Sequence, residues 1–135
     1  MTKTIVEDPY YSIVVDARQR LVVTTPRGLW DFAIAARFLV AQVAALDILP
    51  RYGCPLGQQV TLIDCSEWIV QPQQIATMMG GMLADPRLAS RRIAILAPAP
   101  LLAMQARRVA GGQRFFADRA EALAWLLAPE DDQSP

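Results

Sequence analysis

The chain has 135 residues, and 53% of them are hydrophobic, which suits a single domain with a core of its own. Thirteen basic side chains balance thirteen acidic ones. A zero formal net charge gives no overall attraction to nucleic acid or to an anionic membrane, so we expect no nucleic-acid partner.

The amino-terminal sequence MTKTIVEDPYYS has no apolar signal core. Nowhere do about 18 uncharged apolar residues run together, as a membrane-spanning helix requires. We therefore expect a cytoplasmic protein without stable membrane insertion.

The first predicted elements are a hairpin and a helix. Two β-branched runs, 12–16 and 20–25, are separated by a short polar link, which predicts an antiparallel pair of strands. Apolar residues then recur at helical spacing from Phe32 to Leu46. Asp31, immediately before them, is the expected N-cap of this helix.

The rest of the chain alternates strands and helices. Strands are expected at 60–64, 92–97 and 114–117, and helices from Pro72, over 101–110 and over 118–127. Such short alternation favours parallel pairing through right-handed crossovers. We predict an α/β fold, a small mixed sheet of about five strands with about four flanking helices.

The same pattern predicts how the chain is divided. We expect an amino-terminal tail over residues 1–10, a single domain over residues 11–128 and an acidic carboxyl-terminal tail over residues 129–135.

An apparent active site follows the strand at 60–64, where Asp64, Cys65 and Ser66 are consecutive. A serine or cysteine nucleophile needs a base, but the chain has no histidine and its single lysine, Lys3, lies in the expected tail. Strand alternation also places Cys65 on the opposite face from its two neighbours. We therefore predict no enzyme activity, with Asp64 or Ser66 bonding backbone amides as the chain turns.

The two cysteines, Cys54 and Cys65, form no Cys-x-x-Cys pair and have no histidine to assist them. We expect buried reduced thiols. No metal site and no cofactor is predicted.

Seven arginines and one acid lie between Arg87 and Arg119. A phosphate-binding face is one interpretation of this segment. The other is that these side chains lie on different elements and solvate a surface.

The helix after Pro72 carries several methionines and the pair Gly80-Gly81. Methionines can line an adaptable apolar cavity, and glycines let another backbone approach closely. A lipid-like ligand could lodge beside such a helix. The alternative is an ordinary core stripe.

The carboxyl-terminal sequence RFFADRAEALAWL, the strand end LIDCSEW and the order of elements together resemble the STAS-like family, which includes proteins similar to stage II sporulation protein AA. Its best-known members are bacterial anti-sigma-factor antagonists. The resemblance extends over residues 11 to 128. It implies a mixed sheet flanked by helices that acts through protein contact or ligand sensing, without catalysis.

The helix start departs from the family pattern. Antagonists that act as phosphorylation switches carry Asp-Ser-Ser-Gly there, whereas this chain has Pro-Gln-Gln-Ile at 72–75. We therefore predict a regulatory interaction domain without that switch. The alternative is a carrier or sensor of an apolar, lipid-like molecule, because the chain also resembles a divergent STAS-like branch that is compared with Sec14-type lipid carriers.

Trp68, Gln73 and Gln74 are the candidate interaction residues, and we expect them on one accessible rim. The expected partner is a protein, and the high apolar content favours a homodimer.

Overall fold

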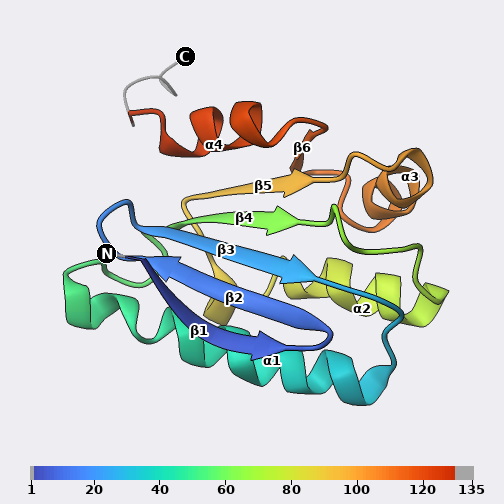
Figure 1. Ribbon diagram of the computed structural model, residues 1–135, viewed down its shortest axis with the longest axis horizontal. Helices are drawn as coiled ribbons and strands as arrows, with labels where there is room; N and C mark the ends of the chain where they lie inside the picture. The colour runs from blue at the N-terminus through green and yellow to red at the C-terminus, as the bar shows by residue number, and fades with distance from the viewer. Residues whose placement is uncertain (1, 130–135) are drawn as a thin grey trace.

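The computed structural model describes residues 2–129, which form a six-stranded mixed sheet in the order β1-β2-β3-β4-β5-β6 (Figure 1). The strands are β1 (Thr2–Asp8), β2 (Tyr11–Asp16), β3 (Leu21–Pro26), β4 (Val60–Asp64), β5 (Arg92–Leu96) and β6 (Arg114–Phe116). β1, β2 and β3 pair antiparallel, and β3 to β6 pair parallel. The predicted α/β fold with a mixed sheet is confirmed.

Four α-helices connect or follow these strands. They are α1 (Phe32–Leu46), α2 (Gln73–Met82), α3 (Pro100–Val109) and α4 (Arg119–Leu127), with short 3-10 turns η1 (Leu49–Tyr52) and η2 (Pro86–Leu88). Asp31 caps α1 as expected, since its carboxylate accepts a hydrogen bond from the Ile34 N–H at 2.8 Å. Asp118 caps α4 in the same way. α2 begins at Gln73, with Pro72 as its N-cap.

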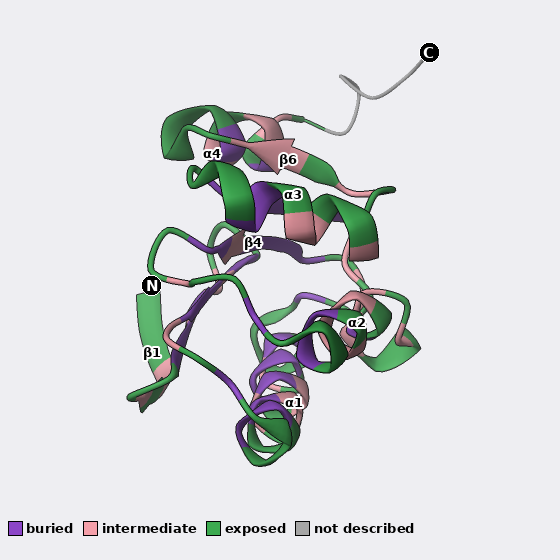
Figure 2. Cartoon of the chain, turned by 90° about the vertical axis from the view of Figure 1, so that its right-hand side faces the viewer, coloured by how far each residue is buried: buried purple, intermediate pink, exposed green. Residues whose placement is uncertain are grey.

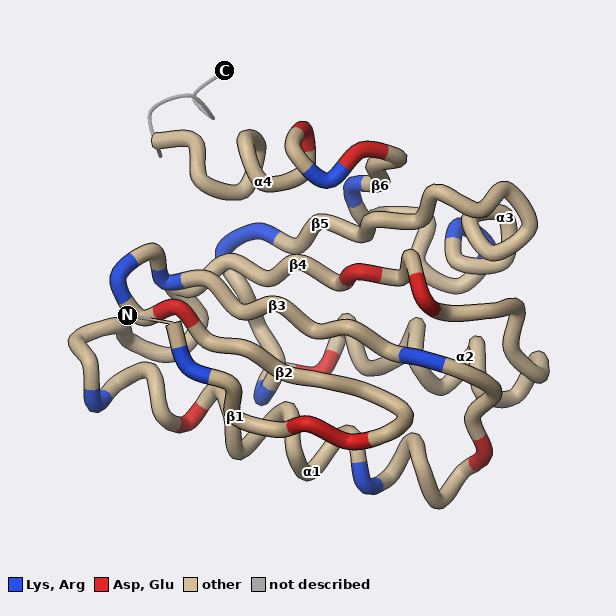
Figure 3. Tube along the Cα trace, in the orientation of Figure 1, with Lys and Arg blue, Asp and Glu red and all other residues tan. Residues whose placement is uncertain are grey.

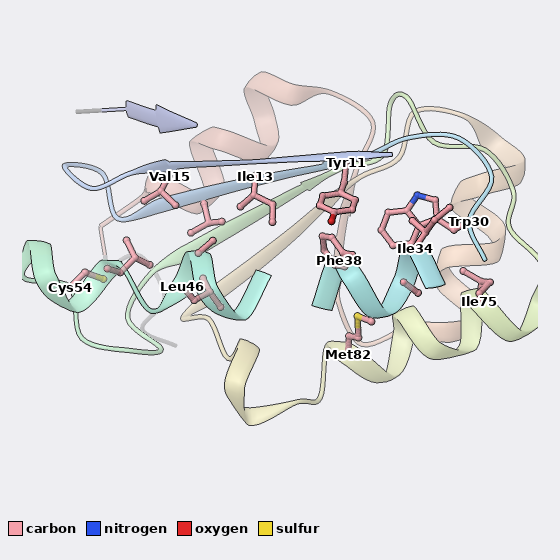
Figure 4. Close-up of a cluster of buried hydrophobic side chains, with 14 residues drawn as sticks. Tyr11, Ile13, Val15, Trp30, Ile34, Phe38, Leu46, Cys54, Ile75 and Met82 are labelled. Carbon is pink, nitrogen blue, oxygen red and sulfur yellow. The ribbon is translucent and has the colours of Figure 1, made fainter. Parts of the chain in front are cut away.

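The helices cover the two faces of the sheet unequally. α1, α2 and α3 pack on one face, where α1 buries its stripe beneath β2 (Figure 4) and α3 packs on Ile93 and Ile95 of β5. α4 covers the other face over β4 and β5, where Leu62 and Leu126 are buried together. The strands alternate between these two cores, as the period of two requires.

The sheet has one strand more than expected, because Thr2–Asp8, placed within an amino-terminal tail by the sequence, form the edge strand β1. Most of its side chains are exposed, so the segment lacks the apolar alternation that reveals a half-buried strand. β1 is fixed instead by backbone pairing with β2 and by the Asp8 carboxylate, which accepts from Arg37 of α1 at 3.1 Å. This bond holds the pKa of Asp8 below its usual value.

At the other end of the chain, the expected acidic tail at 129–135 lies outside the described residues apart from Pro129.

The segment Phe32–Tyr52 is long and apolar enough to cross a membrane by length and composition. In the structure it comprises α1 and η1, and its buried residues, among them Phe38 and Leu46, pack on the sheet. Gln42, also buried, accepts a hydrogen bond from the Thr24 hydroxyl of β3 at 3.0 Å. Such contacts are typical of a helix that packs in the core of a domain.

α2 and α3 approach each other closely at Gly80. A Cβ atom at Gly80 would collide with the backbone carbonyl of Val109 and lie 2.8 Å from the Val109 Cβ. A Cβ at Gly81 would meet nothing within 4 Å. The close approach that the paired glycines suggested therefore depends on Gly80 alone.

Replacing these glycines separately tests the contact. Gly80→Ala should lower the free energy of unfolding by about 2 kcal/mol, because the added methyl group overpacks the contact between the helices. Gly81→Ala should leave it unchanged or raise it by up to about 1 kcal/mol, because alanine favours the helix. Urea denaturation of both variants measures the difference. Equal stabilities would show that the helices do not touch at Gly80.

Candidate functional site

The polar residues after β4 form a structural turn. Asp64 accepts a hydrogen bond from the Ser66 backbone N–H at 3.0 Å, as expected, and its second oxygen accepts from Arg119 at the start of α4. Both carboxylate oxygens therefore hold the turn and α4 in place. Asp64 is buried, whereas Ser66 is exposed.

The thiol beside them is unreactive. Cys65 is 4% exposed, and burial, with a smaller contribution from the Asp64 charge, raises its pKa to about 12. A thiol nucleophile or metal ligand must be deprotonated, so Cys65 is unsuited to either role at neutral pH. Cys54 is also buried, and both cysteines are free, as the sequence predicted. Within residues 2–129, no three His, Cys, Asp or Glu side chains are grouped to hold a metal ion.

Gln71 organises the loop between β4 and α2. Its side chain is 5% exposed, and its carbonyl oxygen accepts from the Trp30 backbone N–H at 2.8 Å. Its amide nitrogen donates to the carbonyls of Gly28 and Ile69, both at 2.8 Å. The buried amide is thereby satisfied by backbone groups of its own loop and of the loop between β3 and α1.

The backbone of Gln71 makes a second, reciprocal contact with α3. Its N–H donates to the side-chain oxygen of Gln105 at 2.8 Å, and the Gln105 amide nitrogen donates back to the Gln71 carbonyl at 2.7 Å. We call these bonds of Gln71 and Gln105 the glutamine clasp. It joins the β3–α1 loop, the β4–α2 loop and α3 at the carboxyl end of the parallel strands.

Sequence reasoning missed both glutamines. Their partners lie 34 to 43 residues away along the chain, apart from Ile69. A glutamine in a loop or on a polar helix face normally contacts water, and no local pattern marks it as buried.

The three clasped segments, together with the first residue of α1, carry large apolar side chains on the surface. They are Leu29, Phe32, Ile69, Val70, Leu101 and Met104, which we call the apolar rim. Figure 2 looks onto this end of the molecule, where α1, α2 and α3 begin. These residues follow the carboxyl ends of β3, β4 and β5, and the clasp holds their segments together.

The predicted interaction residues do not share one environment. Gln73 and Gln74 are exposed in the first turn of α2. Trp68 is only partly exposed, because its ring packs 5.1 Å from that of Trp30 between centroids. Its indole N–H is buried and has no hydrogen-bond partner among the described residues.

Two small cavities lie on either side of Trp68. The first, of about 80 Å³, lies between α2 and α3 above β4 and β5. The second, of about 70 Å³, lies between α1, α2 and the sheet. They share the wall residues Ile63, Trp68, Met79 and Leu83. The methionine-rich helix therefore contributes both to the core, through Met82, and to a cavity wall, through Met79.

The arginines between 87 and 119 are distributed over several elements (Figure 3). Arg87 pairs with Asp85 at 2.7 Å, and Arg119 pairs with Asp64. Arg92 is buried and donates to the Trp125 and Pro129 carbonyls at the end of α4. At least three of the seven arginines are therefore bonded within the chain, and the seven lie on several elements. This favours the interpretation that the segment is no single anion-binding face.

The two neighbouring glutamines Gln71 and Gln73 provide a matched test of the clasp. Gln71→Ala should lower the free energy of unfolding by about 3 kcal/mol, because it leaves the buried Trp30 N–H and the half-buried Gly28 carbonyl without a partner. Gln73→Ala removes only an exposed contact with Thr77 and should change it by less than about 0.5 kcal/mol. Denaturant unfolding distinguishes the two. Equal effects would mean that the Gln71 amide is not buried.

No protein-family model and no curated protein matches the chain. Among solved structures, the crystal structure of an anti-sigma factor antagonist from Mycobacterium paratuberculosis matches with a TM-score of 0.55. The match covers 95% of this chain and 96% of that chain, at 15% sequence identity. A likeness at this identity concerns the fold, and the predicted resemblance is confirmed at that level. The chain has the STAS-like fold of an anti-sigma-factor antagonist.

Proposed function

We propose that the chain is a non-enzymatic, cytoplasmic regulatory domain that binds a protein partner through the apolar rim. The observation that carries the proposal is the exposure of six large apolar side chains on segments held by a buried clasp. Exposed apolar surface on a fixed framework is typical of an interaction site. The fold supports the proposal, since the similar structure is that of a protein described as an antagonist of another protein.

The chemistry of the β4 turn also favours binding over catalysis. The Cys65 thiol is buried and protonated, and the Asp64 carboxylate is engaged by Arg119 and by the backbone. Cys65 therefore lacks both activation and access, and the exposed Ser66 hydroxyl has only an already engaged carboxylate, Asp64, as a neighbouring base.

Control of binding at the start of α2 should not depend on phosphate. Residues 72–75 offer no hydroxyl group, and the exposed amides of Gln73 and Gln74 lie beside the rim residues Ile69 and Val70 in the chain. We propose that these amides supply uncharged polar contacts at the edge of the interface.

A pair of exposed apolar residues tests the rim. Leu101→Ser, at a rim residue that is 70% exposed, should weaken the complex roughly 30-fold, or about 2 kcal/mol. Val40→Ser, at a residue of α1 outside the rim that is 72% exposed, should leave affinity unchanged. Quantitative pull-down from the host, followed by titration of the captured partner, measures both. Equal affinities in two folded variants would contradict the proposal.

The partner in this experiment can be a second copy of the chain. The apolar composition favours a homodimer, and light scattering of the same variants decides whether the rim forms it. A dimer that becomes monomeric in Leu101→Ser would assign the rim to self-association. A dimer unaffected by either change would use another surface.

A second candidate function is the carriage or sensing of an apolar small molecule, which the two cavities beside Trp68 favour. Sites for drug-sized ligands usually enclose roughly 300–1,000 Å³, so these cavities suit a molecule much smaller than a lipid. Native mass spectrometry of protein from its own host should show a retained small mass. Protein that is free of added mass and binds no apolar probe would exclude this function.

A further inference from the structure

We propose that the cavity between α2 and α3 binds a small, mainly apolar molecule, about the size of one aromatic ring, whose single hydrogen-bond acceptor takes the indole N–H of Trp68. This proposal rests on the second candidate function and deepens it by naming the site and the chemical class of the ligand.

The size of the ligand follows from the two adjoining volumes. A cavity of about 150 Å³ in a protein core is known to hold benzene. The α2–α3 cavity has about 80 Å³, and the neighbouring cavity adds about 70 Å³ behind the shared wall. Met79 belongs to that wall, and its unbranched thioether side chain can change rotamer at little cost. A single ring can therefore fit when Met79 moves, whereas a long acyl chain cannot.

The apolar character of the ligand follows from the lining. Most of the lining residues are apolar, among them Ile63, Leu83, Ile95, Leu102 and Val109. The polar lining residues Gln71 and Gln105 are bonded to each other in the glutamine clasp. A water molecule needs two to four polar partners, so this cavity favours an apolar occupant over water.

Trp68 indicates that the ligand carries a hydrogen-bond acceptor. The Trp68 ring lines both cavities, and its N–H group is buried without a partner among residues 2–129. Because this N–H has almost no surface open to the cavities, the indole ring must rotate slightly to present it to a ligand. Buried tryptophan N–H groups usually find an acceptor, and leaving one unpaired costs stability. A ligand carbonyl or ether oxygen would satisfy this donor. A hydrocarbon of the same shape would leave it unpaired.

Ethylbenzene and acetophenone are suitable probes, since they share a ring and a two-carbon substituent and differ by one carbonyl oxygen. Both should bind the wild-type protein saturably in NMR titrations. Acetophenone alone should shift the Trp68 indole N–H resonance downfield. Nuclear Overhauser contacts from either probe to the Met79 methyl group should locate the ligand in the cavity without any substitution.

Trp68→Phe keeps a ring but removes the donor. It should weaken acetophenone binding relative to ethylbenzene binding by roughly threefold to tenfold, the effect of losing one hydrogen bond. The ratio of the two affinities is the measured quantity, because the smaller ring changes the cavity for both probes alike.

Filling the cavity provides the control for location. Ala106 lines the cavity from α3, so Ala106→Leu should abolish binding of both probes. Ala124 is exposed on α4, and Ala124→Leu should bind them as the wild type does. Melting curves establish that the variants are folded.

Three outcomes would overturn the proposal, and they have different meanings. Absence of saturable binding of both probes to the wild type would also exclude the second candidate function. If Trp68→Phe binds both probes with an unchanged affinity ratio, the ligand makes no hydrogen bond to Trp68, and only the apolar part of the site is retained. Probe contacts away from Met79, or full binding by folded Ala106→Leu, would place the ligand elsewhere.

Discussion

The structure at the carboxyl end of the parallel strands depends on the hydrogen bonds of Gln71. One buried side-chain amide satisfies the Trp30 N–H and the Gly28 carbonyl, and the backbone of the same residue is bonded to Gln105. Loops carry backbone polar groups that strands and helices do not pair, and burying them requires partners of this kind. The clasp lets two loops and α3 pack tightly. This packing holds the apolar rim on the surface and the α2–α3 cavity in the interior.

The segment between β4 and α2 contributes residues both to the apolar rim and to the cavities. Trp68 lines the two cavities, Ile69 and Val70 belong to the apolar rim, and Gln71 joins the segment to its neighbours. A ligand that repositions Trp68 would act on residues adjacent to the proposed partner-binding surface. The proposed ligand sensing and the proposed protein binding are therefore compatible on this fold, because the four consecutive residues 68–71 connect the two proposed sites.

Local patterns predicted much of the fold, and long-range bonds account for what they missed. The hairpin, the capping role of Asp31 and the alternation after β3 follow from periodicity and from short polar side chains, which act within a few residues. β1 and the clasp depend on partners distant in sequence, such as Arg37 for Asp8 and Gln105 for Gln71. Trp68 shows the same limit, since its position after polar residues suggested exposure while its ring packs on Trp30.

The β4 turn shows how burial decides whether reactive residue types can react. Asp64, Cys65 and Ser66 look like catalytic groups in sequence, but Arg119 and the backbone engage the acid, and burial keeps the thiol protonated. The accessible surface beside this turn combines the apolar rim and neutral amides with the exposed Ser66 and with Glu67, whose charge is paired with Arg27 at 3.1 Å. Recognition by such a surface depends on shape and apolar contact area more than on charge, and this agrees with a helix start that carries no hydroxyl group for phosphate to modify.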